Sequence, residues 1–286
     1  MKLLAHIAFF DPGTRASSSM DSAAELSSKI GPTSKVSAFW RTFNYNAVTA
    51  LLIEMDAGYN MFQTIDAVID VNPSNGFQHL LRSWPPNGGR RRVHVQVTVH
   101  HNMSHPFRTT WAHRAHMQAH LEQYDWFLYT EGDVFVPASA VLAQTQLALP
   151  LYTRRHRPLG FTRMVNDSRG RLFFSDIRRP VSRSTAFSEP SLGTFAQPDN
   201  AYAASWLYPQ VVMRAFVQSH DWYPVLRTTR GMREKAGVGW RSAGIVVRVD
   251  DPAPLRVFHV GKSGIFYPGN RHGFNSLPAD QLVRDH

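Results

Sequence analysis

A short apolar run that ends in two carboxylates constrains the fold more than any other feature of this sequence. Residues 126–129 read Trp-Phe-Leu-Tyr, a pattern typical of a strand that is buried on both faces. Glu131, Gly132 and Asp133 come directly after it, and a second apolar run begins at once, at 134–136. Acids at the end of a buried strand are costly unless a metal, a base or a substrate faces them. The sequence therefore predicts a site for a divalent cation at the carboxyl end of this strand.

The segments before these acids alternate between strand and helix patterns. Alternating or continuous apolar residues predict strands at 2–10, 61–71 and 93–99. Helical spacing of apolar residues predicts helices at 39–55 and 105–121. Strands that alternate with helices are typical of an α/β fold, in which helices flank a mostly parallel central sheet.

Polar residues near the predicted strand ends are candidate ligand contacts, because sheets of this class bind ligands at the carboxyl ends of their strands. Arg15 follows the first strand and can meet a phosphate, and Asp70 ends the second strand and can meet a ribose or a base. Arg108 lies near the start of the predicted helix at 105–121, where an anion is favoured. Surface solvation and helix capping are the alternative interpretations.

The same predicted helix carries His113, His116 and His120 on one face, because their spacing follows the helical period. Histidines gathered in this way can bind a metal. No acidic residue accompanies them, so we interpret them as a polar helix face instead.

The pattern changes after residue 136. Helices are predicted at 137–148 and 209–218, whereas residues 177–197 are irregular and polar and are interpreted as a lid or an acceptor loop. The remaining elements are predicted strands, at 160–165, 171–174, 245–249 and 256–260. Neither a repeat nor a clear linker divides the chain, so we expect a single domain over residues 1–286.

The charge balance suggests an anionic partner. The chain carries 31 Lys and Arg residues against 21 Asp and Glu, a formal net charge of +10. The arginines are spread along the chain without a recognised nucleic-acid-binding motif, so a phosphorylated small molecule explains the charge as well as nucleic acid does. The absence of cysteine excludes disulfides, zinc–thiolate sites and a thiol nucleophile.

The sequence shows no transmembrane pattern, because no apolar run approaches the ~20 residues that span a bilayer. The apolar run at 1–10 is interrupted by His6 and lacks a small-residue cleavage site, so a strand is favoured over a signal peptide. Asn102 and Asn166 begin formal glycosylation sequons, which often arise by chance. The compartment, cytoplasmic or lumenal in the secretory pathway, stays open.

Taken together, these features resemble the nucleotide-sugar-dependent glycosyltransferases of the GT-A fold. The similarity rests on the alternation of strands and helices, on the acidic triplet that follows a strand, and on a late histidine, His259, on a predicted strand. Residues 105–136 look like the part of such enzymes that leads into a Thr-Glu-Asp-Asp motif. The triplet Glu-Gly-Asp departs from the family's Asp-x-Asp pattern at its first position.

The resemblance implies a Mn²⁺ or Mg²⁺ ion that bridges the phosphates of a nucleotide-diphosphate sugar. Carboxylate oxygens suit both ions, and a neutral imidazole also suits Mn²⁺. Asp133 is the expected direct ligand, Glu131 a ligand or a contact to the ribose, and His259 a further ligand. Lys262, within Gly-Lys-Ser-Gly, is expected to hold the diphosphate together with neighbouring backbone N–H groups.

Sugar transfer with inversion also needs a carboxylate base that takes the proton of the acceptor hydroxyl. Glu234 resembles the position at which the family carries its catalytic acid, and it is favoured over Asp199. Asp199 precedes an aromatic segment in which Tyr202 and Trp206 can bind an acceptor sugar. The sequence leaves open whether the reaction inverts or retains the anomeric configuration.

The sequence thus predicts a GT-A-like α/β enzyme, a hexosyl- or pentosyltransferase that moves a sugar to a glycan or another hydroxyl acceptor. Residues 1–136 form the expected nucleotide-sugar-binding half, and residues 137–286 the acceptor-binding and catalytic half. A nucleotidyltransferase or another phosphoryl-transfer enzyme is one alternative, since a similar acidic site can hold a metal-bound triphosphate. A basic nucleic-acid-binding module is the other, although it gives no reason for acids after a buried strand.

Overall fold

The computed structural model describes most of the chain. It covers residues 1–9, 34–72, 78–84, 92–101, 106–166, 170–223, 232–260 and 277–284. Within these ranges only the backbone is described at 34–44, 78, 106–107, 183, 232–234 and 284.

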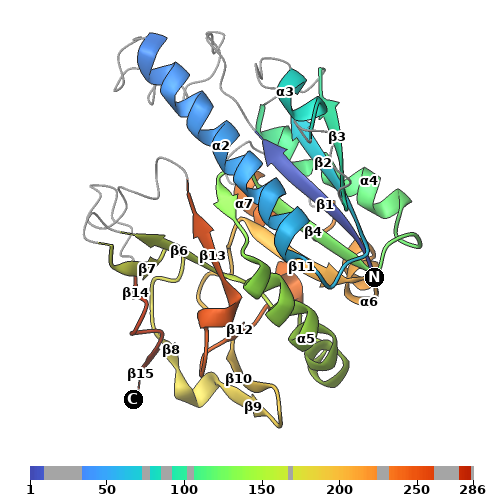
Figure 1. Ribbon diagram of the computed structural model, residues 1–286. Helices are drawn as coiled ribbons and strands as arrows, with labels where there is room; N and C mark the ends of the chain where they lie inside the picture. The colour runs from blue at the N-terminus through green and yellow to red at the C-terminus, as the bar shows by residue number, and fades with distance from the viewer. Residues whose placement is uncertain are drawn as a thin grey trace.

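A five-stranded, parallel-rich sheet lies at the centre of the fold (Figure 1). Its strand order is β11–β4–β1–β2–β3; the first four strands of the chain run parallel, and β11 pairs antiparallel with β4. The strands are β1 (Lys2–Phe9), β2 (Thr64–Val71), β3 (Val93–Val99), β4 (Trp126–Glu131) and β11 (Ser205–Pro209). This mixed α/β architecture confirms the predicted fold class at that level.

Helices cover both faces of this sheet, and alternate residues of each strand face one set or the other. Leu3, Ala5 and Ile7 of β1 pack in one apolar cluster with α2 and α5, while Leu4 and Ala8 pack in another with α4, α6 and α7. Burial on both faces explains why β1 and β4 are almost continuously apolar. The helices are α2 (Ser34–Gly58), α3 (Gln78–Arg82), α4 (His113–Ala119), α5 (Ala138–Arg155), α6 (Gln210–Val217) and α7 (Met232–Gly237).

A second five-stranded sheet, of order β14–β7–β6–β13–β5, lies beside the first (Figure 1). Only β6 and β13 pair in parallel in it. The strands predicted at 160–165 and 171–174 correspond to β6 and β7, which pair antiparallel. The strands are β5 (Val134–Phe135), β6 (Thr162–Asn166), β7 (Leu172–Phe174), β13 (Arg256–His259) and β14 (Leu277–Pro278).

Short elements complete the fold. Strands β12, β10 and β9 form a small sheet, and β15 pairs with β8. The strands are β8 (Val181–Ser182), β9 (Phe187–Glu189), β10 (Gly193–Ala196), β12 (Val247–Arg248) and β15 (Val283–Arg284). The 3-10 helices are η1 (Pro106–Trp111), η2 (Arg183–Thr185), η3 (Arg241–Ala243) and η4 (Ala253–Leu255). In the described residues no helix has the length and apolar character to cross a membrane.

Two secondary-structure predictions were wrong. The single helix predicted at 105–121 is divided into η1 and α4, because the adjacent residues Thr109 and Thr110 have low helix propensity. The segment 177–197, predicted to be irregular, contains β8, β9 and β10. These strands are only two to four residues long, and two of them pair with segments far away in the sequence.

Candidate functional site

The Glu-Gly-Asp corner joins the two large sheets. Glu131 is the last residue of β4 in the first sheet, and Val134 begins β5 in the second. The backbone N–H of Glu131 donates to the carbonyl of Ala204 at 3.0 Å, and that of Gly132 donates to the carbonyl of Ala8 at 2.9 Å. The corner therefore lies at the carboxyl ends of β1 and β4, the edge at which parallel sheets bind ligands.

Close packing explains the glycine of this corner. A Cβ at Gly132 would lie 3.2 Å from side-chain atoms of Phe9 and Val48, and 3.3 Å from the Cα of Phe9. Larger residues therefore push α2 and β1 away from the corner.

Gly132→Ala is expected to lower the free energy of unfolding by about 1–3 kcal/mol, the usual cost of overpacking. Urea denaturation measures the change. Ser139→Ala, at an exposed position of α5, is the control and should alter stability by no more than about 0.5 kcal/mol. Equal stability of the two variants would contradict the packing argument.

Asp133 and His259 meet at this corner. Nε2 of His259 lies 3.1 Å from Oδ2 of Asp133, although the residues are 126 positions apart in the sequence. The pairing of β13 with β5 places His259 opposite Val134, and the N–H of Val260 donates to the carbonyl of Asp133 at 2.8 Å. Both side chains are largely buried, at 4% exposure for His259 and 26% for Asp133.

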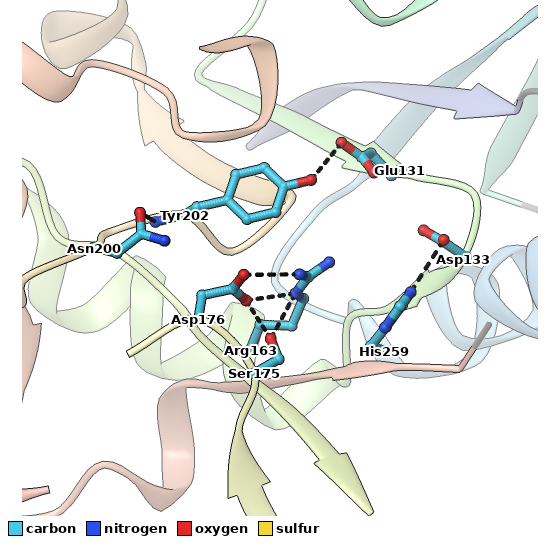
Figure 2. A network of polar contacts seen from close by, with 8 residues as sticks. All are labelled: Glu131, Asp133, Arg163, Ser175, Asp176, Asn200, Tyr202 and His259. Atoms are coloured by element: carbon cyan, nitrogen blue, oxygen red, sulfur yellow. Dashed lines mark hydrogen bonds and ion pairs between the residues drawn. The ribbon is translucent and has the colours of Figure 1, made fainter. Parts of the chain in front are cut away.

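Glu131 lies beside a second group of polar residues around Arg163 (Figure 2). The hydroxyl of Tyr202 donates to Oε1 of Glu131 at 2.9 Å. Arg163 of β6 donates from Nε and Nη2 to the two oxygens of Asp176, at 2.8 and 2.9 Å, and from Nε to the hydroxyl of Ser175. Its guanidinium carbon lies 4.8 Å from the centre of the Tyr202 ring.

The charge of Arg163 is held by its acidic neighbours. Burial disfavours the charged guanidinium, but Asp176, Tyr202 and Glu131 more than offset that cost and raise the pKa of Arg163 above its usual value. Glu131, Asp133 and Asp176 thus share this corner with Arg163 (Figure 2). Carboxylates and an imidazole are donors that suit a divalent cation such as Mn²⁺.

The donor set suits such a cation only in part. The described residues hold no group of three or more His, Asp or Glu side chains arranged as a complete metal site. Mg²⁺ commonly uses one or two carboxylates and completes its coordination with substrate phosphates and water. Asp133 and His259 fit this partial arrangement, so binding of Mn²⁺ or Mg²⁺ stays a prediction that requires a ligand's oxygens.

A second polar network lies in the first sheet, around Asp70. Both of its oxygens accept hydrogen bonds, from Nδ1 of His6 at 2.7 Å and from Nε2 of His100 at 2.8 Å. Burial alone would raise the pKa of this carboxyl group, yet the two histidines lower it below its usual value. Asp70 itself is 2% exposed. His100, which donates to it, is partly exposed and is the member of this pair that lies nearer the surface.

The histidines of α4 continue this network. Nε2 of His6 lies 2.9 Å from Nδ1 of His116, and Nδ1 of His120 donates to the carbonyl of His116 at 2.8 Å. Burial and the neighbouring histidines lower the pKa of His116 to about 4. His113 is completely buried against Tyr129, so the interpretation as a polar helix face was wrong for this residue, whereas His116 and His120 are partly exposed.

The candidate base Glu234 lies on α7, and only its backbone is described. Helix α7 packs beside the acidic corner. A Cβ built at Gly237, its last residue, would lie 3.2 Å from Oε1 of Glu131. Asp199 is exposed, and it accepts the backbone N–H of Arg178 at 3.2 Å. The helix that carries Glu234 therefore packs against Glu131. The described contact of Asp199 is instead with Arg178.

The predicted nucleotide contacts are spread over the sheet edge. Asp70 and Glu131 flank Ala8 in register, so two strand spacings, about 10 Å, separate their backbones. Arg108 is exposed in η1. Arg15 and Lys262 lie outside the described residues. These assignments stay predictions.

Sequence reasoning missed Arg163 and Asp176 and misjudged two aromatic residues. Tyr202 and Trp206, considered as contacts to an acceptor sugar, are buried at 8% and 1% exposure. Tyr202 instead positions Glu131, and Trp206 donates to the carbonyl of Ala236 at 3.3 Å. The available signal for Arg163 was its charge within the mostly buried strand β6.

Comparisons with known proteins add little to this geometry. No family model and no curated protein matches the chain. Among solved structures, the chain is similar to a crystal structure titled "Putative Glucose-1-Phosphate Thymidylyltransferase from Bacillus anthracis in Complex with a Sucrose", with 10% sequence identity. The match covers 82% of this chain and 78% of that one at a TM-score of 0.33, a value that supports no argument about fold or activity.

Proposed function

We propose that this chain is a divalent-cation-dependent glycosyltransferase of the GT-A type that uses a nucleotide-diphosphate sugar and a hydroxyl acceptor. The observation that carries the proposal is the contact between Asp133 and His259 at the carboxyl edge of a parallel-rich sheet. An acid and an imidazole from distant parts of the chain meet there, beside Glu131. That donor set suits a cation that is completed by phosphate oxygens.

The residues of the corner have separate roles in this proposal. Asp133 and His259 hold Mn²⁺ or Mg²⁺, and Glu131 contacts the ion or the ribose. The cation, when bound, supplies charge stabilisation for the departing diphosphate. Tyr202 fixes the carboxylate of Glu131 by its hydrogen bond. Lys262, Arg15 and Arg108 bind the diphosphate, and His100, which Asp70 holds by a hydrogen bond, serves the nucleoside end.

The proton of the acceptor hydroxyl passes to a carboxylate in an inverting reaction. Glu234 is the favoured base, because its helix packs against Glu131. Asp199 already accepts a backbone hydrogen bond and is exposed, which makes it the weaker choice. The oxygen of the acceptor then attacks the anomeric carbon, and the bond to the diphosphate breaks.

A thermal-shift screen tests the proposal. The probes are UDP with UDP-glucose, GDP with GDP-mannose, and dTDP with dTDP-glucose, each with Mn²⁺ and with EDTA. At least one pair should raise Tm in Mn²⁺, since a ligand at a hundred times its Kd stabilises the folded state by about 2.7 kcal/mol. Equal shifts in EDTA, or no shift with any probe, would contradict the proposed function.

Product analysis separates this activity from nucleotidyl transfer. Incubation with a binding nucleotide-sugar and a mixture of hydroxyl acceptors should release the nucleoside diphosphate. Release of nucleoside triphosphate from the nucleotide-sugar on addition of pyrophosphate would instead identify a nucleotidyltransferase and overturn the proposed reaction.

A further inference from the structure

One nitrogen of Arg163 has no hydrogen-bond partner among the residues that the structure describes. Its Nε and Nη2 atoms are occupied by Asp176 and Ser175. Its Nη1 atom is buried and, within the described part of the chain, makes no hydrogen bond. The side chain is 8% exposed. A buried donor left without an acceptor costs free energy, so a specific group of this kind calls for an explanation.

The direction of this nitrogen is fixed by its surroundings. Figure 2 shows it on the side of the guanidinium away from Asp176, turned toward the space between Glu131 and Asp133. The paired hydrogen bonds to Asp176 and the ring of Tyr202 hold the plane of the guanidinium in place. Nη1 is therefore a rigid hydrogen-bond donor that points into the candidate site.

We propose that Nη1 of Arg163 donates a hydrogen bond to a hydroxyl oxygen of the sugar that is transferred. This inference rests on the proposed function and adds a sugar-binding residue to it. The sugar is bonded directly to the diphosphate, so a diphosphate held at Asp133 and His259 brings the sugar next to the space that Nη1 faces.

Charge decides between the sugar and the diphosphate as the acceptor. The two paired hydrogen bonds to Asp176 already compensate the positive charge of Arg163, and Glu131 is a second acidic neighbour. A phosphate placed against Arg163 would also face these acids, which repel it. A hydroxyl group carries no net charge, and its oxygen accepts the hydrogen bond without that repulsion.

Arg163→Lys tests the proposal, because lysine keeps the positive charge beside Asp176 but lacks the third nitrogen of the fork. Isothermal titration calorimetry in Mn²⁺ compares UDP with UDP-glucose, or the corresponding GDP or dTDP pair if the screen selects it. The variant should bind the nucleoside diphosphate as the unmodified chain does and bind the nucleotide-sugar at least about tenfold more weakly, the usual effect of losing a hydrogen bond from a charged donor.

Arg155→Lys is the matched control. Arg155 also pairs with an acid, Glu189, and stacks on an aromatic ring, Phe187, but it lies far from the corner at the end of α5. Its substitution should leave both affinities unchanged. Since Arg163→Lys risks unfolding, the double variant Arg163→Met, Asp176→Leu serves as a second test; replacing both partners of a buried pair is often tolerated. The same selective loss is expected.

Each outcome is decisive. Equal weakening of both ligands by the Arg163 variants, or no weakening, would overturn the assignment of Nη1 to the sugar while leaving the proposed function in place. Failure of the unmodified chain to bind any of the three pairs would overturn the proposed function and, with it, this inference.

Discussion

Asp133→Asn is expected to reduce sugar transfer by at least about a hundredfold and to abolish the Tm shift that nucleotide diphosphates give in Mn²⁺. The amide keeps the size of the side chain and its position beside His259, but it removes the negative charge that holds a cation. Charge stabilisation by a bound metal is worth several kcal/mol, and each 1.36 kcal/mol corresponds to a factor of ten in rate. Initial rates in Mn²⁺, together with the thermal shift, measure both effects.

Glu122→Gln provides the control for this experiment. Glu122 is 71% exposed and forms an ion pair with Arg214 on the surface, so its charge can be removed without touching the corner. Rates and shifts should stay at the level of the unmodified chain. If Asp133→Asn behaves like Glu122→Gln, Asp133 does not hold a catalytic cation.

Acid is expected to destabilise the fold between about pH 6.5 and pH 4 through the buried histidines. Burial lowers the pKa of His113 well below its usual value, and burial with its histidine neighbours lowers that of His116 to about 4. In this pH range the unfolded chain therefore binds more protons than the folded chain does. Stability from these groups is complete above about pH 6.5 and is lost as the pH falls toward their folded pKa values. Tm measured across this range should fall steadily.

Asp70 adds a second loss at lower pH. Its pKa is lowered in the folded state, so its contribution to the free energy of unfolding is present above its ordinary pKa and is lost only at lower pH.

The hydrogen bond between His6 and His116 explains how acid changes the structure. Asp70 accepts from Nδ1 of His6, so only one proton fits between Nε2 of His6 and Nδ1 of His116. A second proton places two donors against each other and loosens α4 from the sheet.

His116→Asn isolates this effect. The amide nitrogen can still donate to His6, but it does not titrate, so unfolding near pH 5 should take up about one proton fewer. His79→Gln is the matched control, because the side chain of His79 is exposed and its replacement should leave the pH dependence unchanged. Identical slopes of unfolding free energy against pH in both variants would exclude His116 as the acid-sensitive group.

Much of the fold was predictable because strand and helix patterns are local. The apolar runs of β1 and β4 follow from burial on both faces, and the alternating strand β3 was predicted with its observed bounds. The acidic corner was predictable for the same reason, since it interrupts an apolar run. The meeting of His259 with Asp133 was expected from the family resemblance, and the structure places the two side chains in contact. Their role in metal binding stays a prediction, as does the division into two halves.

Other features depend on pairing across long sequence distances, which leaves no periodic signal. The short strand β8 exists because β15 pairs with it. Arg163 was invisible as a site residue until Asp176, Tyr202 and Glu131 were seen around it.

By itself, the sequence determined the α/β class, the positions of the first four strands along the chain and the two acids at the end of β4, because periodicity and charge are carried by neighbouring residues. Only the tertiary structure decided which side chains contact these two acids. Tyr202 turns Glu131 toward Arg163, and His259 turns toward Asp133 from another strand. Asp70, level with Glu131 on the same sheet face, is instead enclosed by His6 and His100. The reason is physical: burial makes every charge depend on its nearest partners, and the fold rather than the sequence order selects those partners.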